Sequence, residues 1–153
     1  MSRRLSSMHA RAICHATEDV ARVEQALRTV VGDSPVERSR TEGHHGNAIE
    51  IQESSLDDEA RILDMLRRMD PDELAGVEST LDTRMDDACQ VFLRLDKQEA
   101  YAGRLRLTGG DDVVAVRVKV RSFPAKREIA ATIVRDLLQE IASSNVPDAV
   151  HPR

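Results

Sequence analysis

The sequence predicts an α+β domain in which helices pack on one face of a mainly antiparallel sheet. Segments with an apolar residue at every second position alternate with segments whose apolar residues recur every three or four positions. These are the spacings of strands and helices. The two kinds of segment do not repeat as the strand–helix–strand units of a parallel sheet. At 153 residues the chain has the size of one domain, and no apolar run approaches the roughly 18 residues of a membrane-spanning helix.

The first part of the chain contains a helix with a clear start and end. Thr17 is a suitable capping residue, and Val20, Val23 and Leu27 follow at helical spacing. Gly32 ends the run, because glycine readily continues the chain past a last helical turn. The elements expected here are a strand at 8–15, a helix at 18–31 and a hairpin that pairs 36–42 with 47–53.

The middle of the chain is expected to form two acidic helices. Asp70 and Pro71 mark the start of the second helix, because Asp caps helices and proline favours the first helical position. The apolar residues Leu74, Val77 and Leu81 continue it. The helices are expected at 57–69 and 70–87.

The last part returns to strands and closes with a helix. Pro124 opens this helix, which runs to about residue 141. Residues 1–7 and 145–153 are expected to be frayed ends, so the domain covers 8–144. The remaining expected elements are a strand at 89–95, a short turn or helix at 96–101 and a second hairpin made of 104–107 and 113–121.

The net charge of −5 hides a division along the chain. Residues 50–90 carry 4 basic and 13 acidic side chains, whereas residues 91–153 carry 11 basic and 8 acidic ones. The acids therefore concentrate on the middle helices, and the cations on strands. This balance excludes a basic tail that binds nucleic acid through bulk charge.

The strand cations keep a period of two. Arg117, Lys119 and Arg121 alternate with valines, which places cations and valines on opposite faces of a strand. If the basic strands are neighbours, one sheet face is cationic, and such a face is stable beside an anion. Arginine suits phosphate because its fork donates two hydrogen bonds, so RNA is the expected partner. The candidate contacts are Arg38, Arg40, Arg94, Lys97, Arg104, Arg106, Arg117, Lys119 and Arg121, with Lys126 and Arg127 at the start of the last helix.

The segment Gly43-His44-His45-Gly46-Asn47 is the sharpest local motif. One interpretation is a plain hairpin turn with two exposed histidines. A second is RNA contact by His44 and His45, supported by the backbone amides of a glycine-rich loop. A metal site or acid–base catalysis would need further ligands or a nucleophile at suitable spacing, and the sequence offers none.

Other residue types argue against an enzyme and against an RRM-like sheet whose aromatic side chains stack on RNA bases. Cys14 and Cys89 are expected to be reduced, buried thiols. No cofactor or metal motif is present, and neither a P-loop nor an HExxH sequence occurs. The aromatic residues are Phe92, Tyr101 and Phe123, so at most two or three side chains could stack on bases, which argues against an RRM-like mechanism.

Several blocks, taken together in this order, resemble the archaeal family of predicted RNA-binding proteins that are often described as exosome subunits. The resemblance implies a fold like that of the fifth large-subunit ribosomal protein and a cytoplasmic location. It supplies no catalytic residues. The blocks span residues 8–142 and are Cys14-His15-Ala16-Thr17-Glu18-Asp19, Glu42-Gly43-His44-His45-Gly46-Asn47, Leu93-Arg94-Leu95-Asp96-Lys97-Gln98 with Ala100-Tyr101, and Val116-Arg117-Val118-Lys119-Val120 with Pro124-Ala125-Lys126-Arg127-Glu128.

Two functional hypotheses follow from the sequence. The first is a non-catalytic RNA-binding protein, accessory to RNA processing or degradation or to ribosomal RNA, with exosome or ribosome-associated partners. The second is a structural or protein-interaction subunit that uses the acidic helices 57–87 and makes no RNA contact. A homodimer formed through the sheet is compatible with both.

Overall fold

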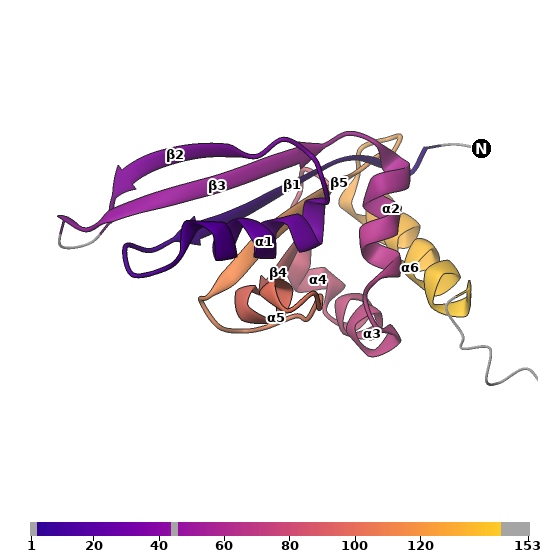
Figure 1. Ribbon diagram of the computed structural model, residues 1–153. Helices are drawn as coiled ribbons and strands as arrows, with labels where there is room; N and C mark the ends of the chain where they lie inside the picture. Colours follow the sequence, from indigo (N-terminus) through magenta and orange to yellow (C-terminus); the bar gives the residue numbers. More distant parts are fainter. Residues whose placement is uncertain (1–2, 44–45, 145–153) are drawn as a thin grey trace, which may run out of the picture.

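A computed structural model describes residues 3–43 and 46–144. One five-stranded sheet carries the helices on a single face, which confirms the α+β prediction (Figure 1). The strands lie in the order β2-β3-β1-β5-β4, and every neighbouring pair is antiparallel. The elements are β1 (Leu5–Cys14), α1 (Val20–Val31), β2 (Glu37–Glu42), β3 (Ala48–Leu56), α2 (Glu59–Arg67), α3 (Pro71–Ser79), α4 (Leu81–Arg84), β4 (Gln90–Asp96), α5 (Lys97–Tyr101), β5 (Val113–Val120) and α6 (Arg127–Ser144).

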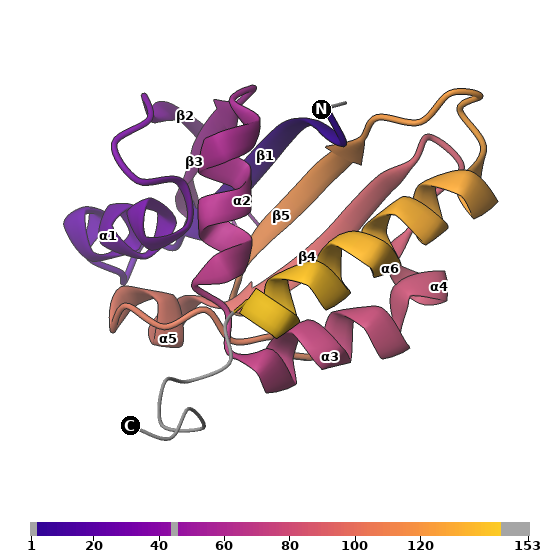
Figure 2. The same cartoon turned by 90° about the vertical axis from the view of Figure 1, so that its right-hand side faces the viewer.

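The core lies between the helices and one face of the central strands. Strict alternation on β5 buries Val114, Val116, Val118 and Val120, and the same alternation buries every second residue of β4. α1 contacts β1 and β3, α2 contacts β1 and β3, and α6 contacts β5. Figure 2 shows α2 and α6 crossing the same side of the sheet. The opposite side of the sheet is covered by no helix of the described residues, and we call it the open face.

Strand β3 does not follow this alternation of buried apolar and exposed polar residues. Gln52 and Ser54 of β3 lie opposite Ala12 and Ala10 of β1, so these polar residues face the helices. They are buried and bonded: the Gln52 amide nitrogen donates to the Val20 carbonyl at 3.2 Å, and the Ser54 hydroxyl donates to the Pro35 carbonyl at 2.8 Å. Ile49 and Ile51 consequently lie on the open face, whereas Leu56, at the end of the strand, is buried on the helix side opposite Met8.

The first hairpin is confirmed and the second is wrong. β2 and β3 pair from Glu37 with Glu53 to Glu42 with Ala48. Residues 104–107 form no strand, and Leu107 makes only an isolated bridge with Leu95. This segment instead follows the outer edge of β4, where the Arg106 carbonyl accepts the amide of Asp96 at 2.8 Å. β5 therefore pairs with β1 and β4.

Several predicted boundaries also move. β1 starts at Leu5 instead of residue 8, because the Leu5 side chain is buried and its amide donates to Glu59 at 2.7 Å. Asp19 caps α1 in place of Thr17, accepting the Ala21 amide at 2.9 Å. The helix expected at 70–87 divides at Thr80 into α3 and α4. No helix of the described part of the chain is long and apolar enough to cross a membrane.

Candidate nucleic-acid interface

The open face carries a group of cations where β1, β5 and β4 adjoin. Directly opposed residues of an antiparallel pair point to the same side. One row therefore contains Arg11, Ala115 and Arg94, and the next contains His9, Arg117 and Phe92. A third row places Lys119 opposite Gln90 of β4 and Ser7 of β1. We call Arg11, Arg94, Arg117 and Lys119 the open-face cations.

The open-face cations differ in how many hydrogen bonds and ion pairs they form within the protein. Arg94 donates to the Gly110 carbonyl at 2.6 Å and lies 3.6 Å from Asp111, while Lys119 donates to the Ala88 carbonyl. Arg11 and Arg117 are exposed and form no hydrogen bond or ion pair with any other described residue. These two guanidinium groups are the ones most available to an external anion.

Arg11 is not among the contacts predicted from the sequence, although the alternation of apolar residues in β1 indicates its position. Met8, Ala10, Ala12 and Cys14 are buried at every second position of β1. The same alternation that singled out the β5 cations therefore places Arg11 on the opposite face.

A shallow depression lies among these residues. It has a volume of about 220 Å³, and Phe92, which is 41% exposed, forms part of its wall. His9 approaches Glu53 at 2.8 Å between its Nε2 and the Glu53 Oε2. Glu53 lies directly opposite Arg11 of β1 and Glu37 of β2, so the row that contains Arg94 and Arg11 becomes acidic toward β2. The lining residues are His9, Arg11, Glu53, Phe92, Ala115, Val116 and Arg117.

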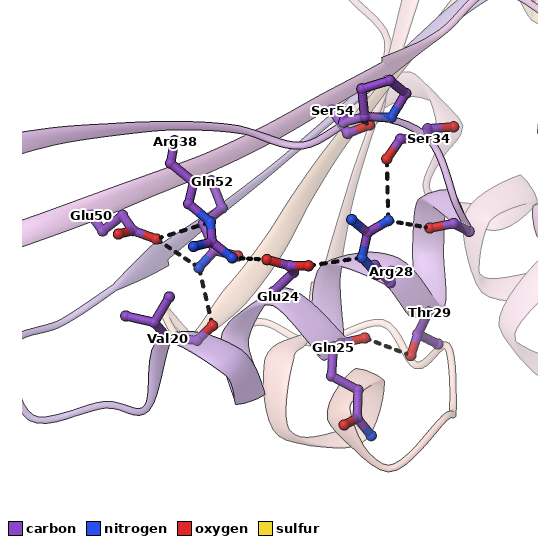
Figure 3. Close-up of polar contacts among 12 residues, drawn as sticks. Val20, Glu24, Gln25, Arg28, Thr29, Ser34, Arg38, Glu50, Gln52 and Ser54 are labelled. Carbon is purple, nitrogen blue, oxygen red and sulfur yellow. Dashed lines mark hydrogen bonds and ion pairs between the residues drawn. The ribbon is translucent and has the colours of Figure 1, made fainter.

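The prediction that all strand cations share one face is wrong for β2. Arg38 and Arg40 lie opposite Gln52 and Glu50 of β3, and these face the helices. Arg38 forms an ion pair with Glu24 of α1, and its Nε lies 3.7 Å from Glu50 (Figure 3). Glu24 also accepts from Arg28 at 2.9 Å. Arg38 thus joins the outer hairpin to α1.

Arg40 has a different environment on the same side. It is exposed and lines a pocket of about 250 Å³ together with Cys14, His15 and Glu50. This pocket is separate from the open-face depression, because Arg40 and Arg117 lie on opposite faces of the sheet.

Lys97 is buried, which argues against its predicted role in RNA contact. Its side chain is only 3% exposed, and its ammonium group donates to the Ile13 carbonyl and to Glu18, each at 2.8 Å. Asp112 accepts from the same ammonium at 2.8 Å. Lys97 therefore ties the end of β1 and the loop before α1 to the loop that precedes β5.

The surroundings of Lys97 shift two pKa values. Burial by itself would lower the pKa of Lys97, but the hydrogen bonds and charges of Asp112 and Glu18 raise it above its ordinary value. Burial by itself would raise the pKa of Asp112, but hydrogen bonds from Lys97 and Gln98 lower it. Both groups are therefore charged across the neutral range.

The other predicted contacts lie outside the open-face group. Arg104 and Arg106 approach Glu99 of α5 at 2.7 and 3.8 Å. Arg127 donates to the carbonyls of Met85 and Asp82 and thereby closes the end of α4. His44 and His45 lie outside the described residues.

The segment after β5 keeps two exposed cations. Lys126 is exposed, and Arg121 lies over the ring of Phe123 with its guanidinium carbon 5.3 Å from the ring centroid. Arg121 follows Lys119 in the sequence at the spacing of two that separates the cations of β5.

The chain has two cysteines, which are candidate nucleophiles by residue type. Cys14 and Cys89 are buried and unbonded to each other, as predicted. Burial, followed by the charges of Glu18 and Glu50, raises the pKa of Cys14, so this thiol is protonated at neutral pH. Within residues 3–43 and 46–144, no three His, Cys, Asp or Glu side chains are grouped so that they could hold a metal ion.

Comparison with known proteins identifies the family of this chain. A family model described as RNA binding matches residues 7–120, most of the chain and all five strands. The chain belongs to this RNA-binding family. The RNA-binding protein PAB1135 of Pyrococcus abyssi is 30% identical over 139 residues, which cover 84% of this chain and 90% of that protein.

Solved structures of archaeal proteins show the same architecture. The DUF54 protein Mth689 of Methanothermobacter thermautotrophicus matches with a TM-score of 0.80 and 31% identity, over 89% of this chain and 99% of that one. Protein AF2318 of Archaeoglobus fulgidus matches with a TM-score of 0.75 and 31% identity, over 87% and 99% of the two chains. The family fold thus covers nearly the whole of the described chain, while the likeness to the fifth large-subunit ribosomal protein stays a prediction.

Replacing Lys97 tests its structural role in this RNA-binding family member. We expect Lys97→Met to lower the free energy of unfolding at pH 7 by about 2 to 3 kcal/mol, because it leaves carboxylates and a carbonyl without their buried partner. Lys126→Met, at an exposed lysine, should change it by less than about 0.5 kcal/mol. Urea denaturation followed by circular dichroism measures both.

The pH dependence of the same variant has a defined sign. The lowered pKa of Asp112 gives stability that is present above its ordinary value of 3.8 and is lost as the pH falls. The raised pKa of Lys97 gives stability that is present below 10.5 and is lost as the pH rises further. The deficit of Lys97→Met should therefore be largest between these limits and shrink beyond them. A deficit independent of pH would contradict the ionic account.

Arg38 and Arg117 form a second matched pair for stability. Arg38→Ala should cost about 1 kcal/mol, because it removes the ion pair with Glu24 and leaves Glu50 without its cation. Arg117→Ala should change stability by less than about 0.5 kcal/mol, since no described residue holds that side chain. Urea denaturation of the two variants tests the assignment, and a larger loss for Arg117→Ala would refute it.

Proposed function

We propose that this protein is a non-catalytic RNA-binding protein that holds the RNA backbone on the open face of its sheet. The observation that carries the proposal is the pair of exposed guanidinium groups of Arg11 and Arg117, which form no ion pair or hydrogen bond within the described chain although Glu53 lies on the strand beside Arg11. Arg94 lies in the same row as Arg11, and Lys119 lies in the row next to that of Arg117. Arg121 extends the cations beyond the end of β5. Membership of the RNA-binding family supports the choice of ligand.

The physical argument is one of charge compensation. Cations on adjacent strands repel one another, and an RNA phosphate placed between them removes that cost. Each phosphate contact releases bound counterions from the RNA, so the logarithm of affinity should fall by about 0.7 per contact for each tenfold increase in salt. Five contacts correspond to a slope of about −3.5 on a single strand. The helices on the other face hold the sheet and make no contact with RNA in this proposal.

The cellular role is proposed to be accessory to RNA processing or degradation, or to ribosomal RNA, in the cytoplasm. Its partners would then be exosome or ribosome-associated proteins, held at least partly through RNA. Copurification that disappears after ribonuclease treatment is the behaviour expected of such an accessory protein. A homodimer formed through the sheet would instead hide the open face and compete with RNA.

Binding measured by fluorescence anisotropy tests the proposed face. A labelled RNA is titrated with wild-type protein across a salt series, and then with the double variant Arg11→Glu, Arg117→Glu. We expect the double variant to bind at least about tenfold more weakly and to show a smaller salt slope. The sequence of the RNA should matter little, because phosphate contacts carry no base information.

A variant with the same change of net charge serves as the control. Arg61→Glu with Arg135→Glu alters two arginines on α2 and α6, on the helix-covered side, which form ion pairs with Asp33 and Asp82. This control should lose less than about threefold in affinity at moderate salt. Equal losses in the two double variants would show that only net charge matters. Failure of the folded wild-type protein to bind RNA at low salt would favour a protein partner for the acidic helices 57–87.

A further inference from the structure

We propose that Phe92 and Phe123 each stack on an unpaired base, so that the RNA held on the open face is single-stranded. This inference rests on the proposed function and adds the class of RNA. It begins with the placement of the two phenylalanines. They are 41% and 80% exposed, and they are the exposed large hydrophobic residues of the described chain.

The exposure of both rings is unusual because burying a phenylalanine stabilises a fold. Full burial of such a side chain contributes about 1.5 to 3 kcal/mol. The core of this protein nevertheless consists of aliphatic side chains, alanines, methionines and cysteines, and neither phenylalanine belongs to it. Both rings instead stand beside cations, the combination that binds single-stranded nucleic acid by stacking and charge.

Phe92 has a ring-sized hollow beside it. The depression of about 220 Å³ is bounded by Phe92, and Ala115 separates Arg11 from Arg94 within its row. Because alanine has only a methyl group, the row is open at that point. A base that enters here would meet the phenyl ring, the imidazole of His9 and the guanidinium of Arg117. These groups stack on bases or donate hydrogen bonds to their edges.

Phe123 offers a second platform at the end of the cation row. The guanidinium of Arg121 lies over its ring at 5.3 Å, a cation–π arrangement. The ring is otherwise largely exposed, which leaves room for a base to stack on it. Arg121 would then lie close to the phosphate that follows or precedes this base.

In this proposal the two rings mark the ends of one track along β5. Phe92 lies opposite Arg117, and Arg121 follows four residues further along the chain. At about 3.3 Å per residue this separation is roughly 13 Å, with Lys119 between the ends. An RNA strand laid along β5 therefore meets a ring, a run of cations and a second ring. A duplex keeps its bases paired and stacked inside, so it can use the cations but not the rings.

Alanine substitutions separate stacking from charge. Affinities are measured by anisotropy for a 12-nucleotide oligouridine and for an RNA duplex of the same length. We expect Phe92→Ala and Phe123→Ala each to weaken binding of the oligouridine about tenfold, and to leave duplex binding within about twofold. Thermal unfolding of each variant verifies that it is folded. Equal effects on both RNAs, or no effect on either, would overturn the stacking proposal.

The absence of tryptophan from the sequence provides a direct readout. Phe92→Trp and Phe123→Trp each introduce a single indole, and stacking on a base should quench its fluorescence as the oligouridine binds. Tyr101→Trp on α5 is the matched control, because Tyr101 is half-buried beside Arg22 on the helix side. It should show no quenching at the same RNA concentration. Unquenched indoles at positions 92 and 123 would refute the inference.

The results for the two proposals are distinguishable. If the arginine double variant loses both RNAs while the phenylalanine variants lose neither, the open face binds RNA without stacking. If the wild-type protein binds the duplex and not the oligouridine, the proposal that it binds RNA is retained and the single-strand inference fails. If it binds no RNA, both proposals fail together.

Discussion

The structure depends on a division of the sheet into one covered and one uncovered face. The alternation of β1, β5 and β4 sends aliphatic side chains to the side where the helices pack. The residues between them are then fixed on the opposite side, whatever their chemistry. Because a shift of one residue in register would exchange the two faces, burial of the valines also specifies where Arg11, Arg94 and Arg117 point.

Cations in this protein serve two separate purposes that their residue types do not reveal. Arg38, Lys97 and Arg127 form internal ion pairs and hydrogen bonds that join elements distant in the sequence. Arg11 and Arg117 make no such contacts within the described chain and remain available at the surface. Two of the sequence blocks that resemble the RNA-binding family meet at Lys97, through its bonds to Ile13 and Glu18. That part of the resemblance therefore reflects the fold and not the proposed RNA contact.

The parts of the fold that depend on local pattern could be predicted from the sequence. Strict alternation identified β5, and apolar residues at helical spacing identified α1. The face of β2 could not be predicted in this way, because it is set by pairing with β3. On β3 the polar Glu50 and Gln52 face α1, while Ile49 and Ile51 lie on the open face, so hydrophobicity gives the wrong side.

The candidate site was predicted in part for the same reason. The alternation that revealed Arg117 and Lys119 applies equally to Arg11, whose strand has small buried alanines in place of valines. The burial of Lys97 depends on carboxylates at positions 18 and 112, which only the folded chain brings together. The exposure of Phe92 follows from its alternation with the buried Val91 and Leu93, although phenylalanine is usually buried.

The central claim is that RNA lies on the open face and leaves the helices free. Chemical-shift mapping of the isotope-labelled 17.0 kDa protein during titration with oligouridine tests this residue by residue. The account predicts that the perturbed signals fall on β1, β4 and β5 and on the segment 121–126. Perturbations concentrated on α2, α3 and α4, with the open face unchanged, would contradict it.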